Sequence, residues 1–315
     1  MSGSEGPGRQ FIHQYEEGLP ETPKDLAQCV KDYANYLLRT TGQGGSSPVA
    51  LEPICDRFFL SLSEADMKSG GVGIGGMNVA EMGMILYDAS DRRTRQRFTQ
   101  AHELVESLVS ALRGNRYRDS VQKYIEQNEK KERLCNWGAS CILMPPGLFD
   151  EYVQEAGLGI EAAEQIGEAF QTSRLATLWH MVYCYPRSVG LVVWKYAHKP
   201  ADEKSIADSS QLSFLDESYR HAPQKELRAQ WNVFGSLAEE YQVPRHKSVS
   251  RDSLIFQAYD EKTLCQGREQ VSLVNLEGEF QIEAAPFEIG YDTYVVSLFH
   301  WPDSLLNAEQ AETFD

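Results

Sequence analysis

The stretch from Arg97 to Leu112, RFTQAHELVESLVSAL, decides how the fold of this 315-residue chain is interpreted. Its apolar residues recur at helical spacing, at Phe98, Ala101, Val105, Leu108, Val109 and Leu112. This pattern predicts one amphipathic helix whose apolar face packs into a core. His102 and Glu106 are four positions apart, so they share a helix face and both can reach one ion.

The run from His102 to Glu106, HELVE, is one residue short of HExxH. In HExxH two histidines bind zinc and the glutamate activates a water molecule. Glu106 stands at the second histidine position, and a carboxylate oxygen is also a zinc ligand, at roughly 2.0–2.2 Å. With a second carboxylate the zinc complex would be formally neutral, which weakens the Lewis acid and suits manganese or iron better. Taken alone, HELVE also fits an ordinary helix with incidental charges.

A second motif follows at residues 132–149, ERLCNWGASCILMPPGLF. Together the two stretches resemble the ImmA/IrrE metallopeptidases, whose patterns are R-F-T-x-A-H-E-x-x-H and E-x-x-A-N-x-F-A-x-x-L-L-M-P. Cys135 stands where alanine is usual in that family, Trp137-Gly138 replaces the usual x-Phe pair, and Glu106 replaces the second histidine. The resemblance extends over roughly residues 24–185. The residues that match are Arg97, Phe98, Thr99, Ala101, His102, Glu103, Glu132, Asn136, Ala139, Leu143, Met144 and Pro145.

The resemblance implies an α+β fold with a zincin-like metallopeptidase core of helices and a small sheet. It implies that His102 and Glu132 ligate a metal, with Glu106 as the third ligand. Zn²⁺ is the expected ion, with Mn²⁺ or Fe²⁺ as alternatives. Glu103 would be the general base that takes a proton from a metal-bound water. Without the family pattern, Glu132 is simply one carboxylate of a solvated run on a helix flank.

Two functions follow from these residues. The first is a metal-dependent endopeptidase that cleaves a specific regulatory protein, with a helix-turn-helix transcriptional repressor as the expected partner. The second is a non-catalytic regulator that keeps the peptidase fold and binds its partner stoichiometrically. Glu106 motivates the second, because Glu103, Glu106 and Glu132 without a metal would crowd three carboxylates together.

Composition restricts the partners and the cellular location that are expected for either function. The net charge of −16 disfavours direct nucleic-acid binding, which depends on a basic face. No stretch approaches the ~20 apolar residues that span a bilayer, and the first residues lack an apolar signal region. Six cysteines without a C-x-x-C pair indicate reduced thiols that pack in the core. The expected location is the cytoplasm, with no membrane partner.

The domain organisation is predicted from composition shifts along the chain. Residues 1–22 are expected to be a flexible tail, and residues 23–198 the metallopeptidase domain, with helix-turn-helix-like helices at about 160–182. Residues 199–224 are a polar linker. Residues 225–315 form a β-rich C-terminal domain of sensory or partner-binding role, with a hairpin turn expected at Glu277-Gly278.

Three further features allow two interpretations each. Gly71, Gly73 and Gly76 have G-x-G-x-x-G spacing, but the strand-like residues that follow favour a turn or hairpin over a dinucleotide site. His180 is either a core histidine, which we favour, or a group that steadies a reacting carbonyl. The basic cluster formed by Arg245, His246, Lys247 and Arg251 is either a solvated loop, which we favour, or an anion site.

Overall fold

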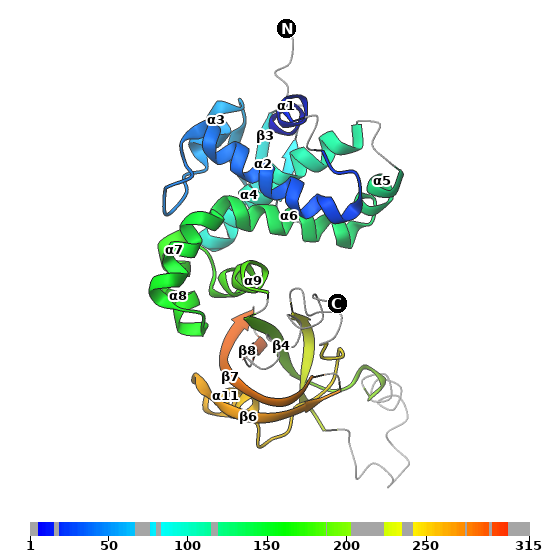
Figure 1. The fold of residues 1–315 in the computed structure, drawn as a ribbon, viewed down its shortest axis with the longest axis vertical. Helices are drawn as coiled ribbons and strands as arrows, with labels where there is room; N and C mark the ends of the chain where they lie inside the picture. Colours follow the sequence, from blue (N-terminus) through cyan, green and yellow to red (C-terminus); the bar gives the residue numbers. More distant parts are fainter. Residues whose placement is uncertain are drawn as a thin grey trace, which may run out of the picture. The chain divides into compact units, whose positions relative to one another are not determined.

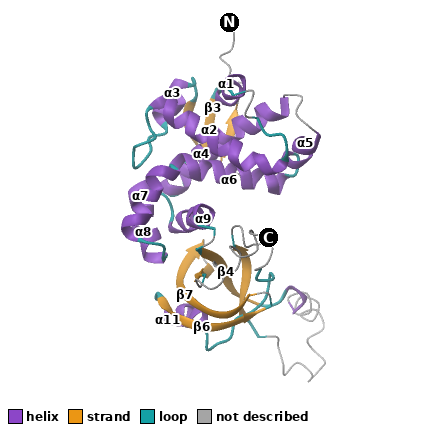
Figure 2. Cartoon of the chain, in the orientation of Figure 1, coloured by secondary structure: helices purple, strands orange, loops and turns teal. Residues whose placement is uncertain are grey.

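The computed structural model describes residues 6–15, 19–66, 76–79, 83–114, 119–186, 188–202, 224–234, 242–274, 276–289 and 292–301. The chain divides into two compact units. The first comprises Met1–Gly157 and Glu161–His180, and the second comprises Leu158–Ile160 and Met181–Asp315. Helices dominate the first unit and strands the second (Figures 1 and 2). The α+β class with a small sheet and a β-rich C-terminal region is therefore confirmed.

The first unit is built largely from helices, with α1, α2, α5 and α6 packed against α4. In chain order the helices are α1 (Pro7–Gln14), the 3-10 helix η2 (Pro23–Asp25), α2 (Leu26–Thr41), α3 (Glu52–Arg57), α4 (Arg93–Gly114), α5 (Asp119–Ile125), α6 (Asn128–Leu143), α7 (Pro146–Ala156), α8 (Ile160–Phe170) and α9 (Arg174–Cys184). The two helices expected at about 160–182 are α8 and α9. Among the described residues, no helix combines the length and apolar character needed to cross a membrane.

The helix predicted from Arg97 to Leu112 is confirmed as the central part of α4. Its apolar face is fully buried at Ala101, Leu104, Val105, Leu108, Val109 and Leu112. This differs from the prediction at two positions, because Leu104 joins the set and Phe98 is only partly buried. The buried hydroxyl of Tyr33, from α2, donates a hydrogen bond to the carbonyl oxygen of Leu104 at 3.0 Å. Burial of this face holds α4 between its neighbours, since apolar area removed from water stabilises by about 25 cal/mol per Å².

Gly138 lets α6 pack closely on α2 and α4. A Cβ atom at this position would lie 2.6 Å from Val30 Cγ1 and 2.7 Å from Val105 Cγ2, well inside normal contact distance. Val30 belongs to α2 and Val105 to α4, so one glycine brings three helices together. The close approach of α4 and α6 sets which of their side chains can meet.

A three-stranded sheet with the order β1-β3-β2 precedes α4 in the chain. β1 (Ser61–Ala65) is parallel to β3 (Met84–Asp88), and β2 (Gly76–Val79) is antiparallel to β3. Gly76 therefore begins one strand of a hairpin-like pair, as predicted, and is not followed by a helix that would open a dinucleotide site. Gly71 and Gly73 lie outside the described residues.

The N-terminal tail expected over residues 1–22 differs in the structure. Residues 1–5 and 16–18 lie outside the described part, but Pro7–Gln14 form α1, with Phe11 and Ile12 buried. A Cβ on Gly8 would lie 2.2 Å from the carbonyl oxygen of Ser107, so α1 rests directly on α4. Because the residues at both ends of α1 are polar, composition alone does not predict that this segment contacts α4.

The second unit is an antiparallel sheet with the order β5-β4-β8-β7-β6. Its elements are β4 (Val189–Ala197), β5 (Glu226–Val233), α11 (Leu254–Glu261), β6 (Cys265–Leu273), β7 (Leu276–Ile289) and β8 (Asp292–His300). The hairpin predicted at Glu277-Gly278 turns slightly earlier, because Leu273 pairs with Leu276 while Gly278 pairs with Val271 inside the ladder.

The division between the units comes earlier than the sequence suggested. The sequence predicts a metallopeptidase domain that ends at residue 198 and therefore includes β4. In the structure β4 pairs with β5 and β8 of the second unit. Its continuous apolar run is explained by its place between two strands of that sheet, where successive residues from 189 to 194 are all buried. Most of the predicted linker, residues 203–223, lies outside the described residues.

Candidate metal centre

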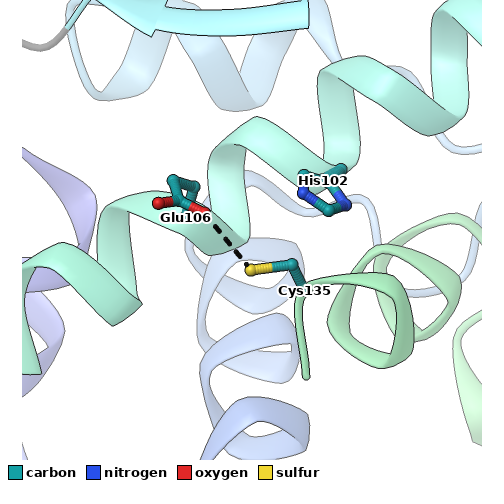
Figure 3. A group of neighbouring side chains, drawn as sticks. All are labelled: His102, Glu106 and Cys135. Atoms are coloured by element: carbon teal, nitrogen blue, oxygen red, sulfur yellow. Dashed lines mark hydrogen bonds between the residues drawn. The ribbon is translucent and has the colours of Figure 1, made fainter. Parts of the chain in front are cut away.

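The candidate centre lies where α4 packs on α6. α4 contributes His102 and Glu106, one turn apart, and α6 contributes Lys131, Glu132, Cys135 and Asn136. Figure 3 shows His102, Glu106 and Cys135 gathered between the two helices. The candidate ligand atoms of these three residues all lie within 4.8 Å of one another.

His102 is oriented by contacts at both ring nitrogens. Its Nδ1 lies 3.1 Å from Asn136 Oδ1, and its Nε2 lies 3.5 Å from Glu132 Oε2. When Nδ1–H donates to the amide oxygen of Asn136, the neutral ring presents the lone pair of Nε2 toward Glu132. A second partner that fixes the tautomer is the usual arrangement for a histidine that ligates a metal.

Glu106 is held by two residues of α6. Lys131 Nζ donates to Glu106 Oε1 at 3.2 Å, and Cys135 Sγ donates to Oε2 at 3.5 Å. Lys131 Nζ also lies 3.3 Å from Glu132 Oε1. Burial lowers the pKa of Lys131, but its hydrogen bonds to both glutamates and their charges outweigh burial and raise the pKa overall. Lys131 is therefore an ammonium ion placed between two carboxylates.

Glu132 stands at the edge of this group. Its side chain is 42% exposed and contacts both His102 and Lys131. The carboxylate thus turns toward His102, and does not simply belong to a solvated run. It is not one of the three residues whose donor atoms lie within 4.8 Å of one another.

Cys135 is the member of the group that sequence reasoning missed. The sequence predicts only a core-packing role for it, and it is fully buried, yet its thiol also faces Glu106. Burial and the charge of Glu106 raise the pKa of this thiol, so it is protonated when no metal is bound. Two signals could have identified it: it replaces the usual alanine, and it lies three positions after Glu132, on the same helix face.

Glu103, the predicted general base, lies one position further round α4 than His102 and is 8% exposed. The edge strand β2 passes directly over it. A Cβ on Gly76 would lie 3.2 Å from Glu103 Oε1 and only 2.1 Å from Thr99 Cγ2. Glu103 is therefore placed beside a strand edge, whereas His102 and Glu106 face α6.

The chemical types of the donor atoms in this group suit a divalent metal. Zinc accepts imidazole nitrogen, carboxylate oxygen and thiolate sulfur, and all three types lie together here. The Lys131 ammonium is the feature that does not belong to a metal site, because a metal between Glu106 and Glu132 would have to displace it. None of the six cysteines forms a disulfide bond.

His180 has no part in this centre. It is fully buried, its Nδ1 lies 3.1 Å from Ser140 Oγ, and its ring packs edge-on against Phe149 at 4.6 Å. Burial lowers the pKa of His180 to about 3, so the ring is neutral at physiological pH. The interpretation as a core histidine is the one that this geometry supports.

A comparison with protein families matches part of the first unit. Residues 61–179 match the family described as the IrrE N-terminal-like domain, Peptidase_M78. Among solved structures, the chain is similar to a Mycobacterium tuberculosis transcriptional regulator, with a TM-score of 0.53 and 11% identity, over 93% of this chain and 80% of that chain. At this identity the likeness concerns the fold alone. Among curated proteins, none matches the chain.

Proposed function

Because residues 61–179 are an ImmA/IrrE-like, metallopeptidase-like domain, we propose that this chain is a divalent-metal-dependent endopeptidase that cleaves a specific regulatory protein. The target class that we propose is a helix-turn-helix transcriptional repressor. The observation that supports the proposal is the packing of α4 on α6, where His102 Nε2 lies 3.5 Å from Glu132 Oε2 and a His102 ring nitrogen lies within 4.8 Å of a Glu106 oxygen. A zincin-like core, with a small sheet whose edge strand lies over α4, is part of the same proposal.

The proposed metal ligands are His102, Glu106 and Glu132, with Zn²⁺ as the ion and Mn²⁺ or Fe²⁺ as alternatives. The ring of His102 is already turned toward Glu132 by Asn136. When bound, a divalent ion supplies a Lewis acid that polarises the scissile carbonyl and makes a water molecule more acidic.

Glu103 is the proposed general base. It follows His102 on α4, and its carboxylate is mostly shielded from solvent. In the proposed reaction it accepts a proton from the attacking water and returns that proton to the amine that leaves when the peptide bond breaks. Both transfers need only one carboxylate that remains in place through the reaction.

The β2 edge is the proposed binding site for the substrate backbone. β2 pairs with β3 on one side only among the described strands, and Met77 on it is 44% exposed. An extended peptide can add to such an edge through main-chain hydrogen bonds. This position would carry the scissile bond past Glu103, which lies beneath β2.

The charge of the chain supports a basic partner. With a net charge of −16, the chain attracts basic proteins such as DNA-binding repressors by long-range electrostatic steering.

To test the proposed function, purified protein is assayed for bound metal and then mixed with candidate repressors, with and without a chelator. Cleavage that the chelator abolishes supports the proposal, and metal-bearing protein that cleaves none of its physical partners contradicts it.

Replacing Gly76 by alanine should impair cleavage without removing the metal. The new methyl group would meet Thr99 Cγ2 at 2.1 Å, so β2 must move away from α4 and from Glu103. A misplacement of about 1 Å can cost on the order of 100-fold in rate. We expect a fall in kcat/KM of at least about tenfold. Gly45→Ala, where a Cβ meets nothing within 4 Å, is the control; equal activity of both variants would exclude β2 from substrate binding.

A second candidate function is the non-catalytic regulator, and Lys131 is the observation that favours it. Its ammonium lies within 3.3 Å of both Glu106 and Glu132. The crowding of carboxylates that a metal would relieve is thus already relieved by a residue of the chain itself. A protein that folds fully, binds its partner and holds no metal after purification would match this candidate.

Lys131→Met should separate the two functions. If a metal binds between the carboxylates, removing the ammonium strengthens its binding, because a unit charge about 4 Å away is worth on the order of 1–4 kcal/mol. We therefore expect affinity for zinc, measured by calorimetric titration of metal-stripped protein, to rise at least about tenfold. The metal-free variant should also melt at a lower temperature than the metal-free parent.

Lys130→Met is the matched control, since Lys130 lies beside Tyr124, with Nζ 4.7 Å from the ring centroid, and is not part of the centre. Zinc affinity that is the same in both variants would show that Lys131 does not occupy the cation position. A variant that gains zinc binding from a parent with none would assign the wild-type chain to the regulator.

A further inference from the structure

We propose that Cys135 is a metal ligand, and that its thiolate is the third donor beside His102 and Glu106. The inference rests on the proposed function in one respect, that the α4–α6 centre binds a divalent ion. It goes beyond that function in naming a donor that changes which metal the centre selects.

Position is the first support. Cys135 projects from α6 toward α4, and its Sγ lies 3.5 Å from Glu106 Oε2 (Figure 3). Its sulfur, a His102 ring nitrogen and a Glu106 oxygen all lie within 4.8 Å of one another. Donor atoms at such separations need to move by little to reach one ion, because zinc holds sulfur at about 2.3 Å and nitrogen or oxygen at about 2.0–2.2 Å.

The sequence change at two sites is the second support. Relative to the metallopeptidase pattern, Glu106 stands where a histidine is usual and Cys135 where an alanine is usual. The two positions are 29 residues apart, yet their side chains meet. The chain therefore lacks the imidazole that is usual at position 106 and carries the thiol of Cys135 beside that position.

Chemistry then distinguishes two ligand sets that share His102 and Glu106. With Glu132 as the third donor the set is rich in oxygen, and manganese or iron compete well with zinc. With Cys135 the third donor is a soft thiolate, which selects zinc over manganese. Glu132, at 42% side-chain exposure, then remains free to keep its contacts with His102 and Lys131.

Binding in this form releases one proton. The thiol of Cys135 loses its proton as sulfur bonds to the ion, and that proton passes to solvent, with no change of oxidation state. The thiol already donates toward Glu106. The resulting complex of a divalent ion with one thiolate, one carboxylate and one neutral imidazole is formally neutral.

Cobalt(II) replaces zinc readily in such sites and provides a direct readout of sulfur ligation. We expect full-length, metal-stripped protein to bind one equivalent of cobalt and to develop an intense near-ultraviolet sulfur-to-cobalt charge-transfer band. Cys135→Ala, which installs the residue usual in the family, should lose that band. It should also bind zinc at least about tenfold more weakly, since even outer-shell changes cost 10–100-fold.

Cys141→Ala is the matched control, because Cys141 is a buried thiol on the same helix and is not one of the three clustered ligands. It should keep the band, and circular dichroism should show that both variants are folded. Wild-type protein that binds cobalt without the charge-transfer band would overturn the role of Cys135 and leave the set of His102, Glu106 and Glu132 standing. Wild-type protein that binds no cobalt and no zinc would overturn the metal centre itself, and this inference with it.

Discussion

Glu103→Gln should abolish cleavage of the natural partner while the metal stays bound. The amide has nearly the shape of the carboxylate but cannot accept a proton from water, and general base catalysis typically contributes 10²–10⁴-fold. We therefore expect kcat to fall by about 10²–10⁴. Because Glu103 is not among the clustered ligands, the zinc content measured by atomic absorption should not change.

The appropriate control is Glu129→Gln, since Glu129 is an exposed carboxylate on α6 and is not one of the clustered donors. It should cleave at the wild-type rate. Persistent cleavage by Glu103→Gln would remove Glu103 as the general base. A loss of metal in the same variant would instead place Glu103 among the ligands, which would contradict its position beneath β2.

Gly138→Leu should destabilise the first unit and abolish metal binding together. Even a Cβ atom at this position lies 2.6 Å from Val30 Cγ1 and 2.7–2.8 Å from both methyl carbons of Val105. Overpacking of a core typically costs about 1–3 kcal/mol, and leucine adds three further carbons beyond Cβ. α6 must then move away from α4, which separates Cys135 and Glu132 from His102.

Thermal denaturation and zinc titration measure the two effects of this change. Gly147→Ala serves as the control, because a Cβ at Gly147, in the first turn of α7, meets nothing within 4 Å. That variant should melt at or slightly above the wild-type temperature, since alanine favours helix over glycine by about 1 kcal/mol. A Gly138→Leu protein as stable as the control would mean that α4 and α6 do not pack as described.

The main helices and the candidate base were predictable from sequence because both depend on local patterns. Helical spacing of apolar residues defined the centre of α4, and the HELVE run marked His102, Glu103 and Glu106 on it. The second motif placed Glu132 on a neighbouring helix, and the resemblance to the ImmA/IrrE family is confirmed for residues 61–179. The β-rich character of the C-terminal region followed from its alternating and apolar runs in the same way.

The positions of β4 and α1 were less predictable, because both depend on contacts with residues far away in the chain. The apolar run of β4 signals a buried strand but does not name its sheet, and it pairs with β8 more than a hundred residues later. α1 has few apolar residues, and its position against the core follows from the burial of Phe11 and Ile12 and from the close approach of Gly8 to α4. Composition reports that a segment will be buried, but not against which element.

The sequence by itself thus determined which residues could do chemistry, and the tertiary structure decided which of them meet. Helical period places Lys131, Glu132 and Cys135 on α6 but does not set the rotation of α6 relative to α4. That rotation follows from close packing at Gly138. It brings a thiol to Glu106 and an ammonium between two carboxylates, and neither contact can be derived from spacing along one helix.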